Sequence, residues 1–150
     1  MQTEDVTKQD RYALQKVRLK RAIAGGFFYE AILIEYAMFE DRTESALRHA
    51  DVRTTDRRQQ PLKLADKLNK INDHPAFQDK FIRKRLTREL IEDVRQWKNK
   101  RDDLVHALMK SPPTDEEARA LAERGRELLR VLENKVRSVN DWRERTIKEK

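Results

Sequence analysis

An arginine and a histidine five residues apart have side chains suited to phosphate chemistry. Arg101 follows Trp97 by four residues and precedes Leu104 by three, so on a helix it falls on the apolar face. His106 lies about 140° further around the same helix. Arginine stays charged and holds phosphate oxygens in a fork, and histidine exchanges a proton near neutral pH. The two groups could together cleave a phosphodiester without a metal, one binding the developing charge and the other moving a proton.

Other kinds of site have little support in the sequence. His49 and His74 lie where helices are expected to end. A histidine near a helix C-terminus interacts favourably with the helix dipole, and this structural role is sufficient to explain both residues. The chain has no cysteine, no pair of histidines four residues apart and no glycine-rich phosphate loop, so we expect no metal site and no cofactor. The absence of cysteine fits a reducing compartment such as the cytoplasm.

Glu35 is the second residue that breaks an apolar pattern. It lies in the run Phe27–Phe39, in which eleven of thirteen residues are apolar or aromatic. An unpaired carboxylate is costly to bury, so Glu35 needs a partner. One candidate is Arg101 across the bundle, and the alternatives are Arg42 or a basic residue of the next helix. Tyr29 and Tyr36 of this run are expected at the edge of the core.

The composition and spacing predict an all-α, up-and-down bundle of four to five helices in one domain, residues 1–150. Charged residues make up 41% of the chain, against about 25% in ordinary domains, and only three glycines and four prolines are present. We expect a long first segment, 8–50, kinked or broken at Gly25-Gly26, because each glycine costs about 1 kcal/mol inside a helix. The later helices are expected to start at Pro61, to run from 76 to 110, and to start after a capping box at Thr114 and Glu117. The ends, 1–7 and 146–150, are expected to fray.

The excess of positive charge is concentrated in one stretch. The net charge is +7, and residues 77–101 hold nine Lys or Arg against four Asp or Glu. Such a field suits an anionic partner, most commonly nucleic acid, although a solvated helix face would look the same. The residues expected to bind RNA phosphates are Arg83, Lys84, Arg88, Arg95, Lys98 and Lys100.

The segment Trp97–Leu108, WKNKRDDLVHAL, resembles the signature of the HEPN superfamily (the higher eukaryote and prokaryote nucleotide-binding domains). That signature is an arginine, four to six further residues, and a histidine, often with a polar residue directly after the arginine. The resemblance covers about 10–145 as a pattern but only 97–108 as a motif. It implies an all-α bundle and, in many members, a metal-independent endoribonuclease of toxin or abortive-infection systems. In the active members, motifs from two domains meet in one cleft, so the resemblance also implies a homodimer.

Asp102 departs from the Asn or His that usually follows the arginine in this family. It puts a negative charge beside the expected phosphate site. It also stands four residues before His106, where its carboxylate could orient the imidazole and raise its pKa.

The sequence therefore predicts a HEPN-like ribonuclease that uses Arg101 and His106, supported by Asp102 and Glu35. Two alternatives remain: a non-catalytic helical module that binds nucleic acid or nucleotide, and the helical partner in a two-protein toxin–antitoxin complex. Expected partners are RNA, a second copy of the chain and an antitoxin protein. No stretch reaches the roughly 18 apolar residues of a membrane-spanning helix, and the polar, acidic first ten residues are unlike a signal peptide.

Overall fold

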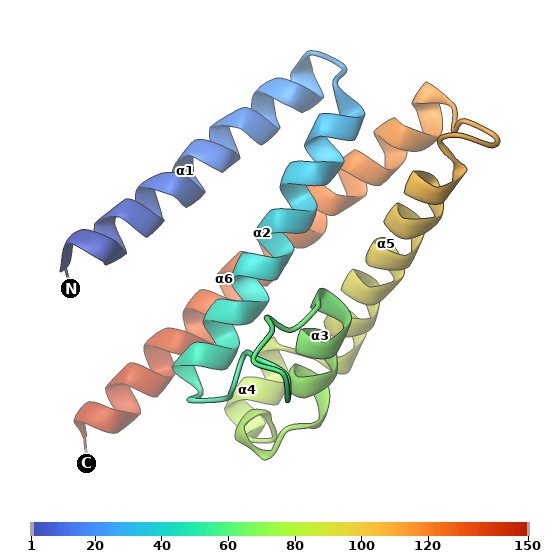
Figure 1. Cartoon of the computed structure of the whole chain (residues 1–150). Helices are drawn as coiled ribbons and strands as arrows, with labels where there is room; N and C mark the ends of the chain where they lie inside the picture. Colours follow the sequence, from blue (N-terminus) through green and yellow to red (C-terminus); the bar gives the residue numbers. More distant parts are fainter. Residues whose placement is uncertain (1, 150) are drawn as a thin grey trace.

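The computed structural model describes residues 2–149, with side chains from residue 7 onward. It confirms an all-α fold: across these residues the β-structure consists of one isolated bridge, between Thr55 and Pro61. Figure 1 shows the four long helices running up, down, up and down, with the short ones packed at one end. The helices are α1 (Gln2–Ala24), α2 (Phe28–His49), α3 (Leu64–Asp73), the 3-10 turn η1 (Pro75–Phe77), α4 (Lys80–Arg85), α5 (Arg88–Ala107) and α6 (Asp115–Lys148).

The break expected at Gly25-Gly26 separates α1 from α2. Gly26 has φ +78°, the left-handed conformation that glycine adopts most readily after a helix. The amide of Phe27 donates to the carbonyl of Ala22 at 2.8 Å, which closes the end of α1. A side chain at Gly25 would meet the Phe27 ring at 2.9 Å. The positive φ of Gly26 is what allows the reversal that lays α1 back along α2, whereas at Gly25 a side chain would displace the exposed Phe27 ring.

The prediction of one helix over 76–110 is wrong. Two polar side chains restart the helix within that range: Asp79 accepts from the amide of Phe81 at 2.7 Å, and Thr87 accepts from the amide of Leu90 at 3.1 Å. The chain thus forms η1, α4 and α5 in succession.

The helix starts expected at Pro61 and Thr114 had different outcomes. Pro61 lies in the bridge to Thr55, and α3 begins three residues later. The cap at Thr114 is confirmed, because its hydroxyl accepts from the amide of Glu117 at 3.1 Å. Helical structure extends into both expected frayed ends, to Gln2 and to Lys148, while Met1 and Lys150 lie outside the described residues.

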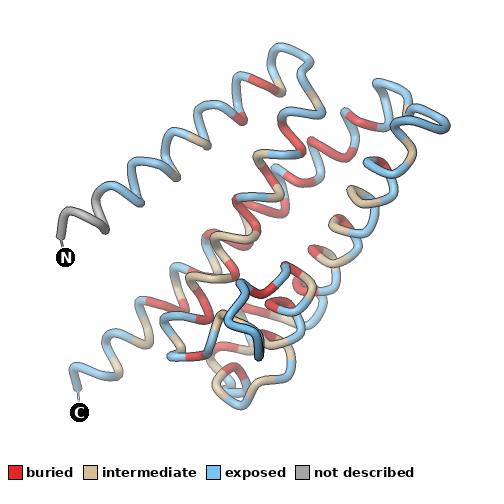
Figure 2. Tube along the Cα trace, in the orientation of Figure 1, coloured by how far each residue is buried: buried red, intermediate tan, exposed pale blue. Residues whose placement is uncertain are grey.

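The core forms where α2 and α6 cross the middle of the bundle. Figure 2 shows buried positions along the facing sides of α2, α5 and α6, whereas those of α1 lie near its C-terminal end. Trp97 of α5 packs on Phe39 of α2 with ring centroids 4.8 Å apart, and its Nε1 donates to the carbonyl of Leu121 in α6 at 2.9 Å. Trp97 thus connects α5 to both α2 and α6, one turn before Arg101. None of the described helices has both the length and the apolar character needed to cross a bilayer.

Candidate functional site

Arg101 lies between α5 and α2, with its guanidinium on an aromatic ring. Its Cζ is 4.2 Å from the ring centroid of Tyr36, a cation–π contact that holds a long side chain in one place. The side chain is 21% exposed. Its Nε is buried and has no hydrogen-bond partner, and Nη1 donates to Asp102 at 3.0 Å. The cation is thus fixed in position while most of its five donors remain without a partner.

Asp102 is bound by two cations of its own helix. Its Oδ1 is 3.0 Å from Arg101 Nη1, and its Oδ2 is 2.9 Å from Lys98 Nζ. Burial raises the pKa of this carboxyl, but the hydrogen bonds from Lys98 and Arg101 outweigh burial and leave the pKa below its usual range. Asp102 is therefore a fixed negative charge that partly neutralises Arg101 and Lys98. The structure shows no contact from it to His106, so the predicted pairing of these two residues is not formed.

His106 is exposed on the last full turn of α5. Arg101 and His106 are about 7.5 Å apart along the helix axis and about 140° apart around it. The two side chains of one chain therefore do not converge on one phosphorus atom. Of the other histidines, His49 lies 3.7 Å from Glu144, and His74 accepts from the amide of Ala76 at 3.1 Å. Each of these two has a local structural role.

Glu35 does not pair with Arg101, with Arg42 or with a basic residue of α3. It is 0% exposed, and neither of its carboxylate oxygens has a hydrogen-bond partner. A side chain at Gly125 of α6 would come within 2.5 Å of Glu35 Oε1, so this glycine provides the space for the carboxyl. Burial raises the pKa of Glu35 to about 9, against a smaller opposing effect of Arg126. The group is neutral at pH 7 and belongs to the core.

The residues predicted to bind RNA do not form one patch. Arg83 is directed inward and donates to the carbonyls of Asn72 and of Leu86, the latter at 3.1 Å. Arg95 is bound to Asn69 at 2.7 Å and to Glu92 at 3.3 Å. Both arginines therefore connect helices.

The remaining predicted cations are spread over the molecule. Lys98 lies beside Arg101. Lys84 and Arg88 are exposed where α4 meets α5, with Arg88 about 20 Å along the helix from Arg101. Lys100 lines a different surface, a groove of about 690 Å³ between α5 and α6 that also includes Leu104 and Pro113.

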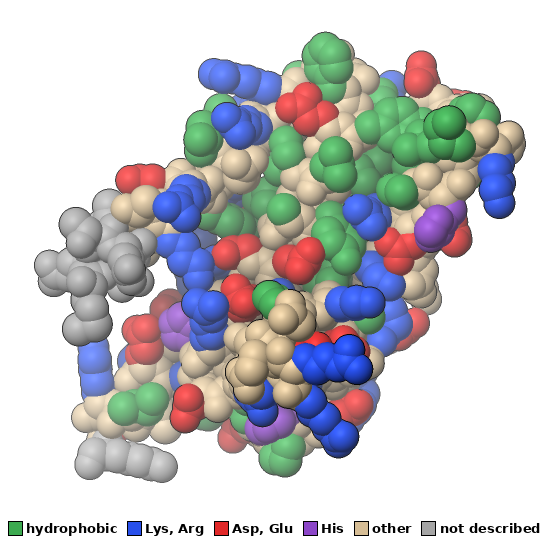
Figure 3. All heavy atoms as spheres, viewed as in Figure 1, with side chains coloured by type: hydrophobic (Ala, Val, Ile, Leu, Met, Phe, Trp, Pro, Cys, Tyr) green, Lys and Arg blue, Asp and Glu red, His purple; other side chains and the backbone are tan. Residues whose placement is uncertain are grey.

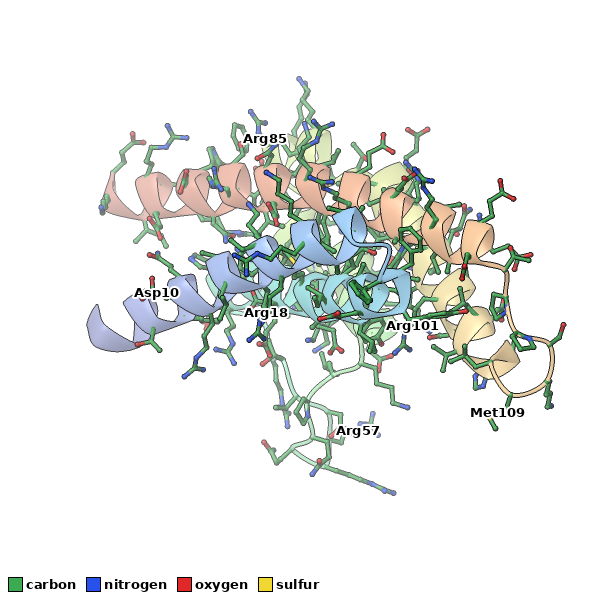
Figure 4. All side chains as sticks on the ribbon, turned by 90° about the horizontal axis from the view of Figure 1, so that it is seen from above. Asp10, Arg18, Arg57, Arg85, Arg101 and Met109 are labelled. Atoms are coloured by element: carbon green, nitrogen blue, oxygen red, sulfur yellow. The ribbon has the colours of Figure 1, made fainter. Side chains whose placement is uncertain are left out.

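An exposed apolar surface borders Arg101. Figure 3 shows hydrophobic side chains gathered at the end of the bundle where α2 begins and α5 ends. Leu33 is 59% exposed and Met109 94% exposed, and Tyr29 donates weakly to the carbonyl of Pro113 at 3.5 Å. In Figure 4 Arg101 lies beside α2, and Met109 extends from the turn after α5. We call this surface the apolar end; its members are Phe27, Tyr29, Leu33, Val105, Leu108 and Met109.

Tyr36 is the site residue that the sequence analysis did not identify. The sequence predicts Tyr36 only as a residue at the edge of the core, where it lies. Burial and then nearby Glu40 raise its pKa, so the ring stays a neutral phenol under Arg101. The spacing of Tyr29, Leu33 and Tyr36 was a usable signal, because residues four and seven apart share one side of a helix.

Comparison with protein-family models, with curated proteins and with solved structures finds no match to this chain. Among the described side chains no group of three His, Asp or Glu is placed to hold a metal ion.

Proposed function

We propose that the protein is a metal-independent endoribonuclease of the HEPN type that acts as a homodimer in the cytoplasm, as a toxin or antiviral effector. The observation that carries this proposal is the state of Arg101. Its guanidinium is fixed on Tyr36 yet partly exposed, and its one hydrogen bond goes to Asp102. A cation held in this way is preorganised for a phosphate oxygen.

In this mechanism His106 moves the protons and Arg101 binds the charge. A neutral imidazole takes the proton of the ribose 2′-hydroxyl, the 2′-oxygen attacks phosphorus, and the bond to the 5′-oxygen breaks. The leaving 5′-oxygen receives a proton from a second imidazolium. The products are a 2′,3′-cyclic phosphate and a 5′-hydroxyl. Arg101 stabilises the additional negative charge on the phosphorane oxygens.

The geometry of α5 supports the proposal of a dimer. One copy presents one Arg101 and one His106 on different sides of the helix, so two copies are needed to bring an arginine and two histidines around one phosphate. The apolar end lies directly beside Arg101 and includes Val105, which precedes His106. An exposed apolar surface with polar surroundings is typical of a protein–protein interface. Pairing through this surface would bring the two α5 motifs close together.

RNA cleavage in EDTA tests the proposal. Wild type is expected to cleave a labelled single-stranded RNA, and H106A is expected to leave it intact while melting at the same temperature. The matched control is H49A, which removes another exposed histidine and should cleave like wild type. Equal cleavage by wild type and H106A would refute the assignment.

A specific observation also favours a second function, nucleic-acid binding without cleavage. The carboxylate of Asp102 partly neutralises Arg101 and Lys98, and none of the described side chains forms a hydrogen bond or ion pair that would orient His106. This alternative predicts salt-dependent RNA binding, no cleavage by wild type, and no gain of cleavage when Asp102 is replaced by Asn.

A further inference from the structure

A second positively charged surface lies away from Arg101, in a groove between α1 and α6. The groove has a volume of about 670 Å³. Its floor is made by Leu19 of α1, Met38 of α2 and Leu129 of α6. Met38 lies about 200° around α2 from Tyr36, so the groove and Arg101 are on opposite sides of that helix.

The acidic side chains of the groove are already bound. Glu123 lies 3.0 Å from Arg119, and Glu127 lies 3.4 Å from Arg124. Glu133 accepts from the Tyr12 hydroxyl and lies 2.9 Å from Lys16. Each carboxylate therefore has a cation of the protein beside it.

The basic side chains of the groove are mostly unbound. The structure gives Lys20, Arg126 and Arg130 no hydrogen bond and no ion pair with any described residue. The positive charge continues along α1, where Figure 3 shows several basic side chains. Between residues 7 and 24 that helix has six Lys or Arg and one acidic residue. The cations of α4 and α5 differ, because Arg83, Arg85 and Arg95 are hydrogen-bonded to carbonyls and side chains of the protein itself.

The floor of the groove indicates what kind of ligand fits. Leu19, Met38 and Leu129 are 5%, 3% and 2% exposed. Ile23, the remaining apolar residue of the groove, is half-buried, and none of the exposed large hydrophobic side chains lines the groove. An acidic amphipathic helix buries a continuous apolar face, and it would find no exposed large apolar side chain here. The floor also has no aromatic side chain on which a base could stack. The groove is suited to a ligand that binds through repeated negative charge alone.

We propose that Lys20, Arg126 and Arg130 bind the phosphate backbone of single-stranded RNA, independently of its sequence. In a ribonuclease this surface would anchor the substrate strand at a distance from the cleaved bond. The inference rests on the proposed function for the choice of RNA, but on different residues. Arginine is well suited to the role, because its planar fork matches two phosphate oxygens.

The test is RNA binding by the full chain in an H106A background, so that cleavage does not interfere. The probe is a fluorescein-labelled 20-nucleotide oligouridine, followed by anisotropy from 50 to 300 mM salt. Replacing the three groove cations (K20Q, R126Q, R130Q) is expected to weaken binding about tenfold at low salt and to reduce the slope of log K against log salt by about 2, since each single-strand phosphate contact contributes about 0.7.

A charge-matched control distinguishes the loss of phosphate contacts in the groove from the loss of three positive charges anywhere on the surface. R57Q, R58Q and K110Q remove three exposed cations that form no side-chain contact in the structure, and Figure 4 shows Arg57 on a loop that projects from the helices. This control should bind RNA within about twofold of its parent. An equal loss in both triple variants, or no loss in the groove variant, would overturn the proposal. A poly-glutamate peptide that binds more tightly than RNA, and that no longer binds the groove variant, would overturn the RNA proposal in favour of an acidic protein partner.

This test and the cleavage test can fail separately. Wild type without cleavage, together with groove-dependent RNA binding, would refute the ribonuclease and leave the groove assignment standing. Cleavage that depends on His106, together with normal RNA binding by the groove variant, would refute the groove assignment and leave the ribonuclease standing.

Discussion

At the scale of single residues, the site is defined by what surrounds Arg101. Tyr36 supports the guanidinium from one side, and Asp102 binds one of its nitrogens at 3.0 Å. These neighbours have opposite effects on phosphate binding. The ring fixes the cation without reducing its charge, whereas the carboxylate reduces the net charge that a phosphate would meet.

Replacing Asp102 with Asn should therefore increase activity. D102N releases Arg101 and Lys98 from their shared carboxylate and introduces an Asn, a residue type that often follows the arginine in the proposed family. We expect RNA affinity at low salt to rise by severalfold and cleavage to rise with it. The control D103N removes a neighbouring exposed carboxylate and should behave as wild type. A fall in cleavage in D102N would show that the carboxylate assists His106.

Removing the ring under Arg101 should weaken the site without removing its charge. A cation–π contact contributes about 0.5–2 kcal/mol, so Y36A is expected to reduce cleavage by about 2- to 30-fold, while Y36F keeps the ring and most of the activity. The readout is kcat/KM on a short RNA, with thermal melting as the check on folding. Equal losses in Y36A and Y36F would mean that the hydroxyl, and not the ring, is what matters.

The sequence was sufficient to place Arg101 on the apolar face of its helix, but not to identify its partner. Glu35 and Tyr36 are adjacent and about 100° apart around α2. A small difference in how α2 faces α5 decides whether Arg101 meets a carboxylate or a ring. The partner of Arg101 is therefore set by the tertiary packing of α2 against α5, and the spacing of residues along one helix cannot predict it.

At the scale of helices, the break at the glycines was predicted well, whereas the helix start at Pro61 was not, because α3 begins three residues later. Gly25-Gly26 ends α1 as expected, because Gly26 takes a positive φ. The caps at Asp79 and Thr87 were missed, because the apolar stripe continues through them and periodicity does not register a short interruption. The free cations of α1 were missed for another reason: the sequence alone does not show which Lys and Arg side chains are already paired within the fold.

Glu35 couples α2 to α6 and makes stability depend on pH. The folded protein keeps the proton of Glu35 up to about pH 9, whereas the ordinary pKa is 4.5. Unfolding therefore releases a proton between these values, and the free energy of unfolding falls as pH rises, by at most about 1.4 kcal/mol per pH unit from this group.

The variant E35Q removes this titration. Urea denaturation at pH 5.5, 7 and 8.5 is expected to show that wild type loses stability relative to E35Q as pH rises. E30Q, which changes an exposed carboxylate of the same helix, should retain the wild-type pH dependence. Parallel curves for wild type and E35Q would contradict the neutral, buried state of Glu35.

At the scale of the whole molecule, the proposed mechanism requires two copies joined near the apolar end. Leu33 of α2 is 59% exposed and precedes Tyr36, the ring under Arg101, by three residues. We expect L33E to shift the protein from dimer to monomer in sedimentation experiments and to lose cleavage to the same extent. L14E is the matched control, because Leu14 is 49% exposed on α1, away from this end. A monomeric L33E with full activity would show that one chain is sufficient.

The proposed mechanism depends on attack by the ribose 2′-hydroxyl without a metal, and the chemistry of the cut ends shows whether that attack occurs. The measurement compares wild-type cleavage, in EDTA, of an RNA with one preferred cut site and of the same strand carrying a single 2′-deoxyribose there. We predict a 2′,3′-cyclic phosphate and a 5′-hydroxyl from the RNA, and no cut at the deoxyribose. Cleavage of the deoxy strand at that position, or 5′-phosphate ends, would contradict the account.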